Sequence, residues 1–370
     1  MKLKIAHVVG NRPQFIKLGP FLRATKKYNN EIINIIIHSG QHYDYEMSKI
    51  FFDDLELPKP DYHLQSGSGT HGVQTGKILQ ALDEILIKNK PNIVVVYGDT
   101  NTTLAGALGA YKLNIPVAHV ESGMREGIWR PEEMNKKIAD HCSKFCFCPI
   151  ERACDNLIME GIPEENIFNT GDITYDAFIN SKRLINSKAT IELPRHEYIL
   201  LTMHRAETVD NPKRLGIIIN ALIETKEYEI IFPIHPRTLK ALKDTGLLSK
   251  VEKANHIVLH KPLGYFDFNN FLINSKLILT DSSGVLKEAF YALRPCVTLD
   301  ETTEYKEIFD LGFNILSGFN SEKIKEDIAQ MLSLQKLSLD GKVNPFGNGK
   351  ASEKMVDILI NGGNGNVQFR

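Results

Sequence analysis

The stretch from Val94 to Asn135 decides the fold of this chain. It reads, in order, VVVYGD (94–99), TNTTLAGALGAYKL (100–113), PVAHVE (116–121) and RPEEMN (130–135). Two short apolar runs, separated by a small-residue segment with a helical pattern, predict a parallel β-α-β unit. The carboxyl ends of parallel strands meet at one edge of a sheet, where doubly wound folds bind their ligands. The stretch therefore predicts a parallel sheet together with the edge at which a ligand would bind.

Three carboxylates are expected at that edge. Asp99 and Glu121 each end a predicted strand, and Glu132 opens the next predicted helix behind Pro131. Enzymes that remove protons from carbon use such clusters, because repulsion and partial burial raise the pKa of one carboxyl and leave another ionised. Each acid taken singly is also a good helix cap or ion-pair partner. Their convergence on one edge favours a catalytic role.

Composition and charge narrow the class of protein. A chain of 370 residues is long enough for two domains of ordinary size, and its net charge of -1 gives no general attraction to nucleic acid or to a membrane surface. No apolar run approaches the length of a membrane span, and MKLKIAHVVG at the N-terminus reads as a strand and not as a signal peptide. We therefore expect a cytoplasmic protein that binds neither nucleic acid nor membranes.

The cysteines are few and uneven in number. Cys142, Cys146 and Cys148 lie close together in sequence, as the ligands of a metal site would, and Cys154 and Cys296 complete the set. However, SKFCFCP reads as a short buried strand, and no second ligand pair follows at a zinc spacing. We expect reduced core thiols and no metal.

The strand and helix pattern runs through the chain twice. Apolar strand candidates lie at 4–10, 31–40, 93–99, 116–121 and 144–149 in the first half, and at 198–204, 229–235, 256–260, 276–281 and 295–299 in the second. We predict an α/β fold of two Rossmann-like, doubly wound domains that face each other across a cleft, at 1–172 and 173–350. The segment 351–370 is expected to form a C-terminal helix that packs back on the first domain, followed by a tail.

A glycine turn with nearby cations follows the first predicted strand. Gly10 lets the backbone turn tightly before Asn11 and Arg12, and Lys17 lies on the helix that follows. A helix N-terminus with Arg and Lys beside it is a natural anion site. The pattern is not the GxGxxG of dinucleotide-binding folds, and both cations are also common on ordinary surfaces. Phosphate binding here is a hypothesis that depends on companion motifs.

Two histidine–arginine pairs follow strands of the second half. His204 and Arg205 come at the end of the strand predicted at 198–204, and FPIHPRT supplies His235 and Arg237. Imidazole is a tunable hydrogen-bond donor and arginine offers a planar fork, so such pairs suit a pyrophosphate. Each histidine taken singly is more often an ordinary surface or core residue.

The segment LTDSSGVLKEAF carries a further anion signal. Ser282, Ser283 and Gly284 precede a predicted helix, whose N-terminal amides and hydroxyls can hold phosphate oxygens. Glu288, one turn further on, is placed to accept hydrogen bonds from ribose hydroxyls. The competing interpretation is a capped helix, with Ser282 as the cap and Glu288 in solvent. Spacing alone does not decide between them.

Ten segments, in this order, resemble one family. They are GNRPQFIK, SGQHYDYEMS, YGDTNTTLAGAL, HVESGMR, RPEEMN, MHRAE, HPRT, PLGYFDF, TDSSGVLKEA and PCVTLDETTE. Together they resemble the non-hydrolysing UDP-N-acetylglucosamine 2-epimerases, including the subgroup that acts on UDP-2,3-diacetamido-2,3-dideoxyglucuronate, over about residues 3–330. No single segment is decisive, but the ordered set is highly specific.

The resemblance implies the glycosyltransferase-B architecture and a UDP-sugar substrate, with no cofactor and with a homodimer as the expected assembly. The residues that match UDP ligands in the second domain are Ser282, Ser283, Gly284 and Glu288. The residues that match those facing the pyrophosphate are Arg12 and His204. The acids that match those around the sugar are Asp99, Glu121 and Glu132, with Lys17 beside them.

The implied reaction inverts C2 of UDP-N-acetylglucosamine to the manno form, for surface polysaccharide synthesis. The C2 proton is not next to a carbonyl, so its direct removal would give an unstabilised carbanion. Anti elimination of UDP gives a 2-acetamidoglucal instead, and UDP re-adds after a proton returns to the opposite face of C2. Carboxylates supply the base and the acid, and cations stabilise the departing diphosphate. We assign the proton transfers to Asp99 and Glu121, with Glu132 in support.

Several positions depart from the family pattern and bear on the substrate. They are Asn11, Lys136, Ser283, Leu286 and Asp300, in place of the usual Thr, Arg, Gly, Gln and Arg. A second candidate substrate is the diacetamido uronate, whose carboxylate would need a cation such as Lys136, Arg130 or Arg237. A glycosyltransferase of the same fold, a hydrolysing epimerase and a nucleotide-sugar sensor would each fit part of the pattern as well. Some family members also bind their own substrate at a second site, near segments that match Gln41, His42 and Gln74.

Overall fold

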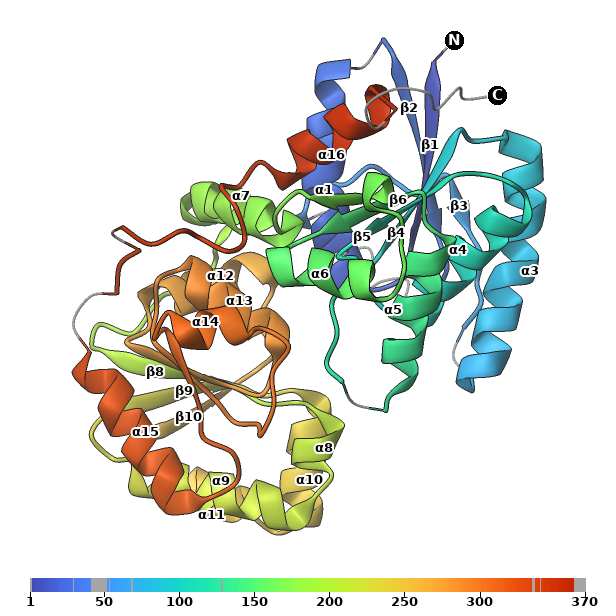
Figure 1. Ribbon diagram of the computed structural model, residues 1–370. Coiled ribbons are helices and arrows are strands. Elements are labelled where there is room, and N and C mark those ends of the chain that lie inside the picture. The colour runs from blue at the N-terminus through green and yellow to red at the C-terminus, as the bar shows by residue number, and fades with distance from the viewer. Residues whose placement is uncertain are drawn as a thin grey trace. The chain divides into compact units, whose positions relative to one another are not determined.

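The computed structural model describes residues 2–28, 30–40, 52, 54–67, 69–127, 129–334, 337–339 and 341–362. The chain forms two compact units, each built on its own parallel sheet with helices on both faces (Figure 1). Unit 1 comprises Met1–Ile179 and Val343–Arg370, and unit 2 comprises Asn180–Lys342. This architecture confirms the predicted fold class of two Rossmann-like, doubly wound units.

The unit boundaries depend on two segments that cross between the units. Helix α7 (Ile173–Lys188) begins in unit 1 and ends in unit 2, so the division falls within this helix, whereas the sequence placed it at 172/173. The chain re-enters unit 1 at Val343, before the expected 350/351. Phe346 is buried there, and its carbonyl accepts a hydrogen bond from the amide of Asp172.

Unit 1 holds seven parallel strands among its described residues, in the order β3-β2-β1-β4-β5-β6-β7. The strands are β1 (Leu3–Val9), β2 (Ile32–His38), β3 (Tyr62–His63), β4 (Ile93–Tyr97), β5 (Val117–Val120), β6 (Phe145–Cys148) and β7 (Ile167–Asn169). The helices, besides α7, are α1 (Arg12–Thr25), α3 (His71–Asn89), α4 (Asn101–Lys112), α5 (Pro131–Cys142), α6 (Glu151–Met159) and α16 (Ala351–Ile360), with 3₁₀ turns at Lys26–Tyr28 and Glu164–Asn166.

Strand β4 lies in the middle of this sheet and is buried along its whole length. Its side chains alternate between two faces: Val95 and Tyr97 join a core with residues of α1 and α16, whereas Val94 and Val96 join a core with residues of α3 and α4. Helix α4 approaches the sheet closely, because a Cβ at Gly106 would lie only 2.8 Å from Cγ1 of Val96. The small residues after β4 therefore set the position of α4.

Helix α16 packs against α1 in unit 1 (Figure 1). The Tyr28 hydroxyl donates a hydrogen bond to Asp357 (2.7 Å). At the other end of α16, the carboxylate of Asp176 accepts hydrogen bonds from the amides of Ala351 (3.1 Å) and Ser352 (2.8 Å). Asp176 therefore caps the N-terminus of α16 from outside the helix.

Unit 2 holds six parallel strands among its described residues, in the order β10-β9-β8-β11-β12-β13. The strands are β8 (Tyr198–Thr202), β9 (Glu229–Pro233), β10 (Ile257–His260), β11 (Leu277–Thr280), β12 (Cys296–Thr298) and β13 (Asn314–Leu316). The helices are α8 (Ala206–Val209), α9 (Pro212–Glu224), α10 (Pro236–Asp244), α11 (Leu248–Lys253), α12 (Tyr265–Asn274), α13 (Ser283–Tyr291), α14 (Lys306–Asp310) and α15 (Ser321–Ser333). Across the described residues of both units, no helix combines the length and apolar character that a membrane crossing requires.

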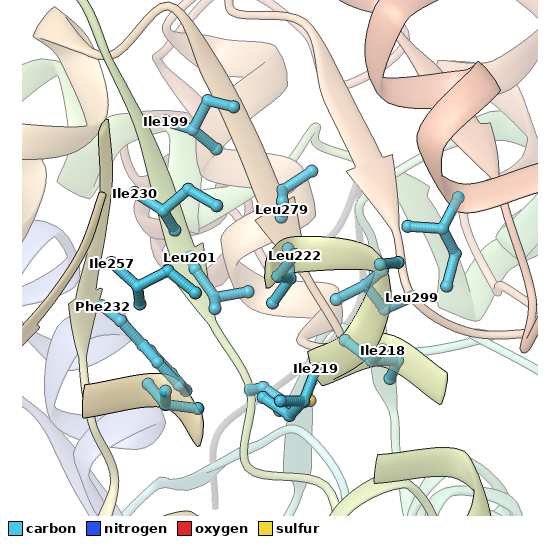
Figure 2. Close-up of a cluster of buried hydrophobic side chains, with 14 of the residues drawn as sticks. Ile199, Leu201, Ile218, Ile219, Leu222, Ile230, Phe232, Ile257, Leu279 and Leu299 are labelled. Atoms are coloured by element: carbon cyan, nitrogen blue, oxygen red, sulfur yellow. The ribbon is translucent and has the colours of Figure 1, made fainter. Parts of the chain in front are cut away.

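A buried hydrophobic cluster of unit 2 joins one face of its sheet to α9 (Figure 2). The strands contribute Ile199, Leu201, Ile230, Phe232 and Leu279, and the helix contributes Ile218, Ile219 and Leu222. The packing follows from the pattern of α9, whose apolar residues recur at three- and four-residue spacing. Leu222 is 0 % exposed, so its side chain is fully committed to this core.

Replacing Leu222 with alanine should lower the stability of unit 2 by about 2–5 kcal/mol, because the deletion removes buried contacts and leaves a cavity. Urea unfolding monitored by circular dichroism measures the change. The matched control on the same helix is Asn220→Ala, which alters an exposed residue and should change stability by less than about 0.5 kcal/mol. Equal midpoints for the two variants would contradict this account of the core.

Candidate active site

The three predicted acids gather in unit 1. Asp99 follows β4, Glu121 follows β5, and Glu132 lies in the first turn of α5. Burial raises the pKa of Asp99, and the charges of Glu121 and Glu132 act in the same direction, whereas Lys136 and Lys17 oppose them. The Asp99 carboxyl thus lies close enough to all four groups to respond to their charges.

Capping does not explain Asp99. The N-cap of α4 is Thr100, whose hydroxyl oxygen accepts a hydrogen bond from the amide of Thr103. The carbonyl of Asp99 accepts a hydrogen bond from the side chain of Asn135 (2.9 Å), which ties the turn after β4 to α5. The side chain of Asp99 is therefore left for another role.

Lys17 on α1 forms a buried ion pair with Glu121. The pair leaves no room beside the turn after β4: a Cβ at Gly98 would lie 3.3 Å from the Lys17 Nζ and 3.4 Å from a Glu121 oxygen. Gly98 and Glu121 both have left-handed backbones, with φ of 67° and 71°. A left-handed backbone in a residue other than glycine costs about 1–2 kcal/mol, so the conformation of Glu121 marks the turn after β5 as a strained site.

The glycine turn after β1 is held by a side chain that its sequence motif does not reveal. Buried Gln14 accepts a hydrogen bond from the amide of Gly10 (2.7 Å) and donates one to the carbonyl of Tyr97 (2.8 Å). Asn11, which stands where the family usually has threonine, caps α1 by accepting a hydrogen bond from the amide of Gln14 (3.2 Å). Arg12 is the first residue of α1, at this same turn.

The cations around the acids have carboxylate partners. Lys136, which stands where the family usually has arginine, is buried and lies 3.1 Å from Glu133. Arg130 lies 3.0 Å from Glu126. Such pairing is what a cluster of partly buried acids requires, since an uncompensated buried charge costs several kcal/mol.

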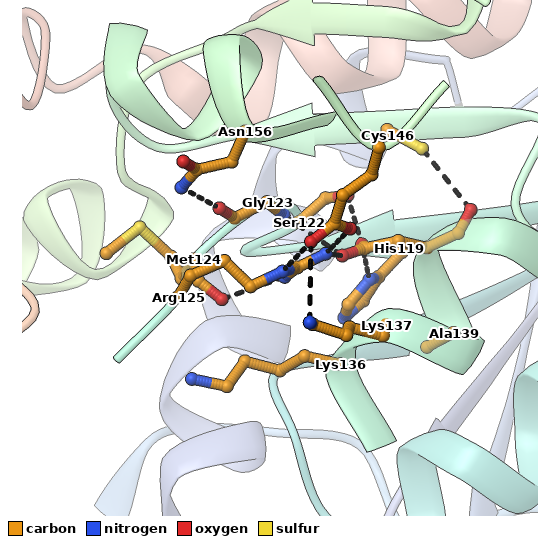
Figure 3. A network of polar contacts seen from close by, with 12 residues as sticks. His119, Ser122, Gly123, Met124, Arg125, Lys136, Lys137, Ala139, Cys146 and Asn156 are labelled. Carbon is orange, nitrogen blue, oxygen red and sulfur yellow. Dashed lines mark hydrogen bonds and ion pairs between the residues drawn. The ribbon is translucent and has the colours of Figure 1, made fainter. Parts of the chain in front are cut away.

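A second polar network, which the sequence motifs did not predict, includes the two residues that follow Glu121 in the chain, Ser122 and Gly123 (Figure 3). Its members include His119 on β5, Asp140 on α5 and Arg125, whose guanidinium lies 2.7 Å from Asp140 and 2.7 Å from Glu160. His119 and Asp140 are 21 residues apart, so no spacing rule would have paired them. The available signal was a histidine within an otherwise apolar strand.

In unit 2, Asp281 organises the turn that follows β8. Its carboxylate accepts hydrogen bonds from the backbone amides of His204 (3.0 Å) and Arg205 (2.8 Å). Burial raises the pKa of Asp281 to about 6, although the two amides and the Arg205 charge oppose the shift. Asp281 thereby connects the end of β11 to the first histidine–arginine pair.

Arg205 is fixed from two sides. Its guanidinium donates to the carboxylate of Asp300 (2.7 Å) and to the hydroxyl of Ser283 (2.9 Å), the first residue of α13. Asp300 stands where the family usually has arginine, and its charge is used here to hold Arg205. The predicted phosphate ligands Arg205 and Ser283 are thus brought together at the N-terminus of a helix.

The other predicted residues of unit 2 lie nearby. The rings of His204 and His235 have centroids 5.5 Å apart. Burial lowers the pKa of His235, and the neighbouring charges of His204 and Arg237 act in the same direction. Ser282 is the N-cap of α13, as the capping interpretation expects, but its side chain makes no cap hydrogen bond. Gly284 and Glu288 lie on α13 itself.

Two further expectations concern the second binding site and the cysteines. Gln41 and His42 of the second binding site lie outside the described residues, whereas Gln74 is described and accepts a hydrogen bond from Asn101 (2.8 Å). The cysteines are unbridged thiols, and burial raises the pKa of Cys146 to about 12.

The raised pKa of Asp281 predicts a pH-dependent stability. The native carboxyl titrates near pH 6 and the unfolded one near pH 4, so the native state binds more protons between these values. The protonated Asp281 carboxyl should therefore contribute to the free energy of unfolding below about pH 4. This contribution, of up to roughly 3 kcal/mol, should be lost as the pH rises to about 6. Urea unfolding of the wild type and of Asp281→Asn across this range measures the difference. Parallel pH profiles would contradict the assignment.

Comparison with known proteins places these features in one family. A family model described as UDP-N-acetylglucosamine 2-epimerase matches residues 24–360. The UDP-N-acetylglucosamine 2-epimerase of Methanocaldococcus jannaschii is 45% identical over 370 residues, with 97% of this chain and 100% of that protein covered. Its crystal structure in complex with UDP-GlcNAc and UDP aligns with a TM-score of 0.85 at 45% identity, covering 97% of this chain and 99% of the other.

Two further matches are a second epimerase and a protein that shares only the fold with this chain. The UDP-2,3-diacetamido-2,3-dideoxy-D-glucuronate 2-epimerase of Pseudomonas aeruginosa is 40% identical over 362 residues, which cover 96% of this chain and 99% of that protein. A lipopolysaccharide outer core galactosyltransferase, only 12% identical, shares the fold alone, with a TM-score of 0.55 and coverage of 97% and 100%. The match over most of the chain and the identities of 40–45% show that this chain belongs to the UDP-N-acetylglucosamine 2-epimerase family and is an isomerase.

Proposed function

We propose that this chain inverts C2 of UDP-N-acetylglucosamine to give UDP-N-acetylmannosamine, a precursor for surface polysaccharides. The observation that carries the proposal is the group of Asp99, Glu121 and Glu132 around Lys17 in unit 1, which is chemistry suited to proton transfer at carbon. Unit 2 supplies the complementary chemistry for a diphosphate, through Arg205 and the start of α13.

The acids of unit 1 differ in a way that suits an acid and a base. The ion pair with Lys17 favours the ionised form of Glu121, which suits it to take the C2 proton. The raised pKa of Asp99 suits it to hold a proton and deliver it to the opposite face of C2. Glu132 would support them by its charge. This division of roles between Asp99 and Glu121 is a proposal.

The proton transfer at C2 is coupled to the loss and return of UDP. As the base takes the proton, the C1–O bond to the diphosphate breaks and its electron pair leaves with UDP, giving the 2-acetamidoglucal. A proton then adds to the other face of C2, and a diphosphate oxygen adds back to C1. The full cycle therefore removes and returns one proton and one UDP. The balanced cycle needs no external oxidant or reductant.

Unit 2 is suited to stabilise the departing UDP. Two of the five N–H groups of Arg205 are used by Asp300 and Ser283, so others can meet phosphate oxygens. The N-terminal amides of α13, at Ser283 and Gly284, provide further donors, and His204 with His235 lies at the same strand edge. Glu288 is proposed to bind the ribose, and Arg12 of unit 1 the pyrophosphate.

Charge pairing around the acids favours a neutral hexosamine over a uronate. Of the cations that could bind a uronate carboxylate, Lys136 is paired with Glu133 and Arg130 with Glu126. Arg237, in unit 2, lies 3.7 Å from Asp210. A further carboxylate near Asp99 would add to the repulsion that already raises its pKa. UDP-N-acetylglucosamine is therefore the substrate that this charge distribution supports best.

The assembly and location of the protein are also proposals. A homodimer rests on the family resemblance alone, and light scattering of the purified chain checks it. A cytoplasmic location fits the buried, unbridged thiols of Cys146 and Cys148, because such thiols persist in a reducing compartment. Cell fractionation checks the location.

Epimerisation should be visible directly by proton NMR of the enzyme with UDP-N-acetylglucosamine in deuterated water. We expect deuterium to enter C2 while UDP-N-acetylmannosamine signals appear, because the C2–H bond is broken in each turnover. Release of UDP with the free hexosamine would indicate a hydrolysing enzyme instead. Turnover of the diacetamido uronate with no exchange in UDP-N-acetylglucosamine would overturn the substrate assignment, and exchange in neither would favour glycosyl transfer.

Glu121→Gln should lower kcat by at least about 10²-fold while UDP still binds, because the change removes a proton acceptor from unit 1 and leaves unit 2 unaltered. A coupled assay measures kcat, and calorimetry with UDP measures the affinity for UDP. The matched control, Glu84→Gln, alters an exposed acid on α3 and should leave both unchanged. A Glu121→Gln enzyme that keeps its kcat would remove Glu121 from the proton transfers.

A further inference from the structure

Asp140 receives an unusual number of hydrogen bonds for one fully buried carboxylate. One oxygen accepts from His119 Nδ1 (2.6 Å) and from the hydroxyl of Ser122, and the other accepts from the amide of Gly123 (3.3 Å) and from Arg125 Nη2 (2.7 Å). Figure 3 labels the four donors, of which His119 lies on β5 and Ser122, Gly123 and Arg125 lie in the segment that follows it. Asp140 thus connects α5 to the residues on both sides of Glu121.

The contacts of His119 fix its protonation. Its Nε2 lies 2.7 Å from the carbonyl oxygen of Gly98, which can only accept a hydrogen bond, so Nε2 carries a proton. Its Nδ1 lies 2.6 Å from a carboxylate oxygen of Asp140, and two lone pairs cannot face each other at that distance. The other donors to Asp140, from Ser122, the Gly123 amide and Arg125, favour its carboxylate form, so we assign this proton to Nδ1 and His119 donates in both directions as an imidazolium.

The network interleaves charges of both signs, and Lys137 adds a further cation 3.8 Å from Glu160. His119 and Arg125 carry one positive charge each, and Asp140 and Glu160 carry one negative charge each, with Arg125 donating to Glu160 at 2.9 and 2.7 Å. Burial alone would raise the pKa of Asp140, but the His119 charge and hydrogen bond, together with Arg125 and Ser122, outweigh it and lower the pKa.

The two ends of the network reach the two turns that carry the acids. The imidazolium holds the carbonyl of Gly98, the left-handed residue directly before Asp99. At the other end, Asp140 accepts hydrogen bonds from Ser122 and Gly123 and so holds the chain directly after Glu121, whose own backbone is left-handed. The left-handed backbone at Glu121, a residue other than glycine, is strained and persists only where surrounding contacts over-determine it. One carboxylate, directly or through His119, therefore contacts both turns.

We propose that Asp140 is a positioning residue for the proton transfers, fixing Asp99 through the doubly protonated His119 and Glu121 through Ser122 and Gly123. This inference rests on the proposed function of the acids. Asp140 does not touch the substrate in this role. It sets the direction in which two other carboxylates face, and small errors in such directions lower rates strongly.

Asp140→Asn tests the proposal, since it keeps the shape of the side chain and removes the charge that holds the imidazolium. We expect kcat for UDP-N-acetylglucosamine to fall by about 10²-fold, while KM and the affinity for UDP change little. The matched control is Asp176→Asn, another buried acid of unit 1 that caps α16 and lies outside this network. It should lower stability and leave kcat unchanged. Equal losses of kcat in both variants would overturn a positioning role.

Double variants separate the two arms of the network. His119→Gln and Ser122→Ala each remove one arm, so their losses of kcat should multiply when combined. Asp140→Asn should mask both, and adding His119→Gln to it should reduce kcat no further. Independent, multiplying losses for Asp140→Asn and His119→Gln would contradict action through one chain of contacts. Because each arm is also tested alone, the design still decides if Asp140→Asn does not fold.

Nitrogen NMR of the histidine rings gives a readout that does not depend on turnover. Wild-type protein should show an imidazolium at His119, assigned by its loss in His119→Gln, and Asp140→Asn should convert it to the neutral ring. A neutral His119 in the wild type overturns the inference whatever the activity. A wild-type imidazolium without C2 exchange would instead overturn the proposed function.

Discussion

Charge compensation at the edge of the unit 1 sheet is the constraint on which the site depends. A buried charge without a partner costs several kcal/mol, so a cluster of carboxylates persists there only if cations are interleaved with it. The ion pairs that achieve this join Lys17 to Glu121, Lys136 to Glu133 and Arg125 to Asp140. At Asp99 burial outweighs the nearby cations, and its pKa rises. One carboxyl can therefore hold a proton while another stays ionised, which is the separation that acid–base chemistry needs.

The sequence predicted those elements of the fold whose hydrophobic pattern is long and regular. Long buried strands such as β4 and β8 were found because their apolar runs are continuous and bounded by turn residues. The short edge strands β3 (Tyr62–His63) and β13 (Asn314–Leu316) were missed, since two or three residues carry no period. The division between the two compact units falls within α7, which continues across it without any local sign in its sequence.

For the site, the sequence could identify residues at strand ends but not the residues that hold them. Asp99 and Glu121 were found because strand order alone directs them to one edge. Gln14, His119 and Asp140 were not found, since their roles arise from hydrogen bonds between segments far apart in the chain. A histidine in an apolar strand has many possible partners, and only the fold shows that both of its nitrogens face oxygen.

One departure from the family pattern reverses a charge beside the predicted phosphate ligands of unit 2. Asp300 replaces an arginine, yet it orders Arg205 together with Ser283. A preordered arginine loses less conformational freedom when a diphosphate binds, but the adjacent carboxylate also weakens its net attraction. Under the proposed mechanism UDP has to leave and then attack again, so binding that stabilised free UDP too strongly would slow its return. Arg205, which is held in one orientation and whose charge is partly offset by Asp300, can bind the departing UDP without holding it too tightly to return.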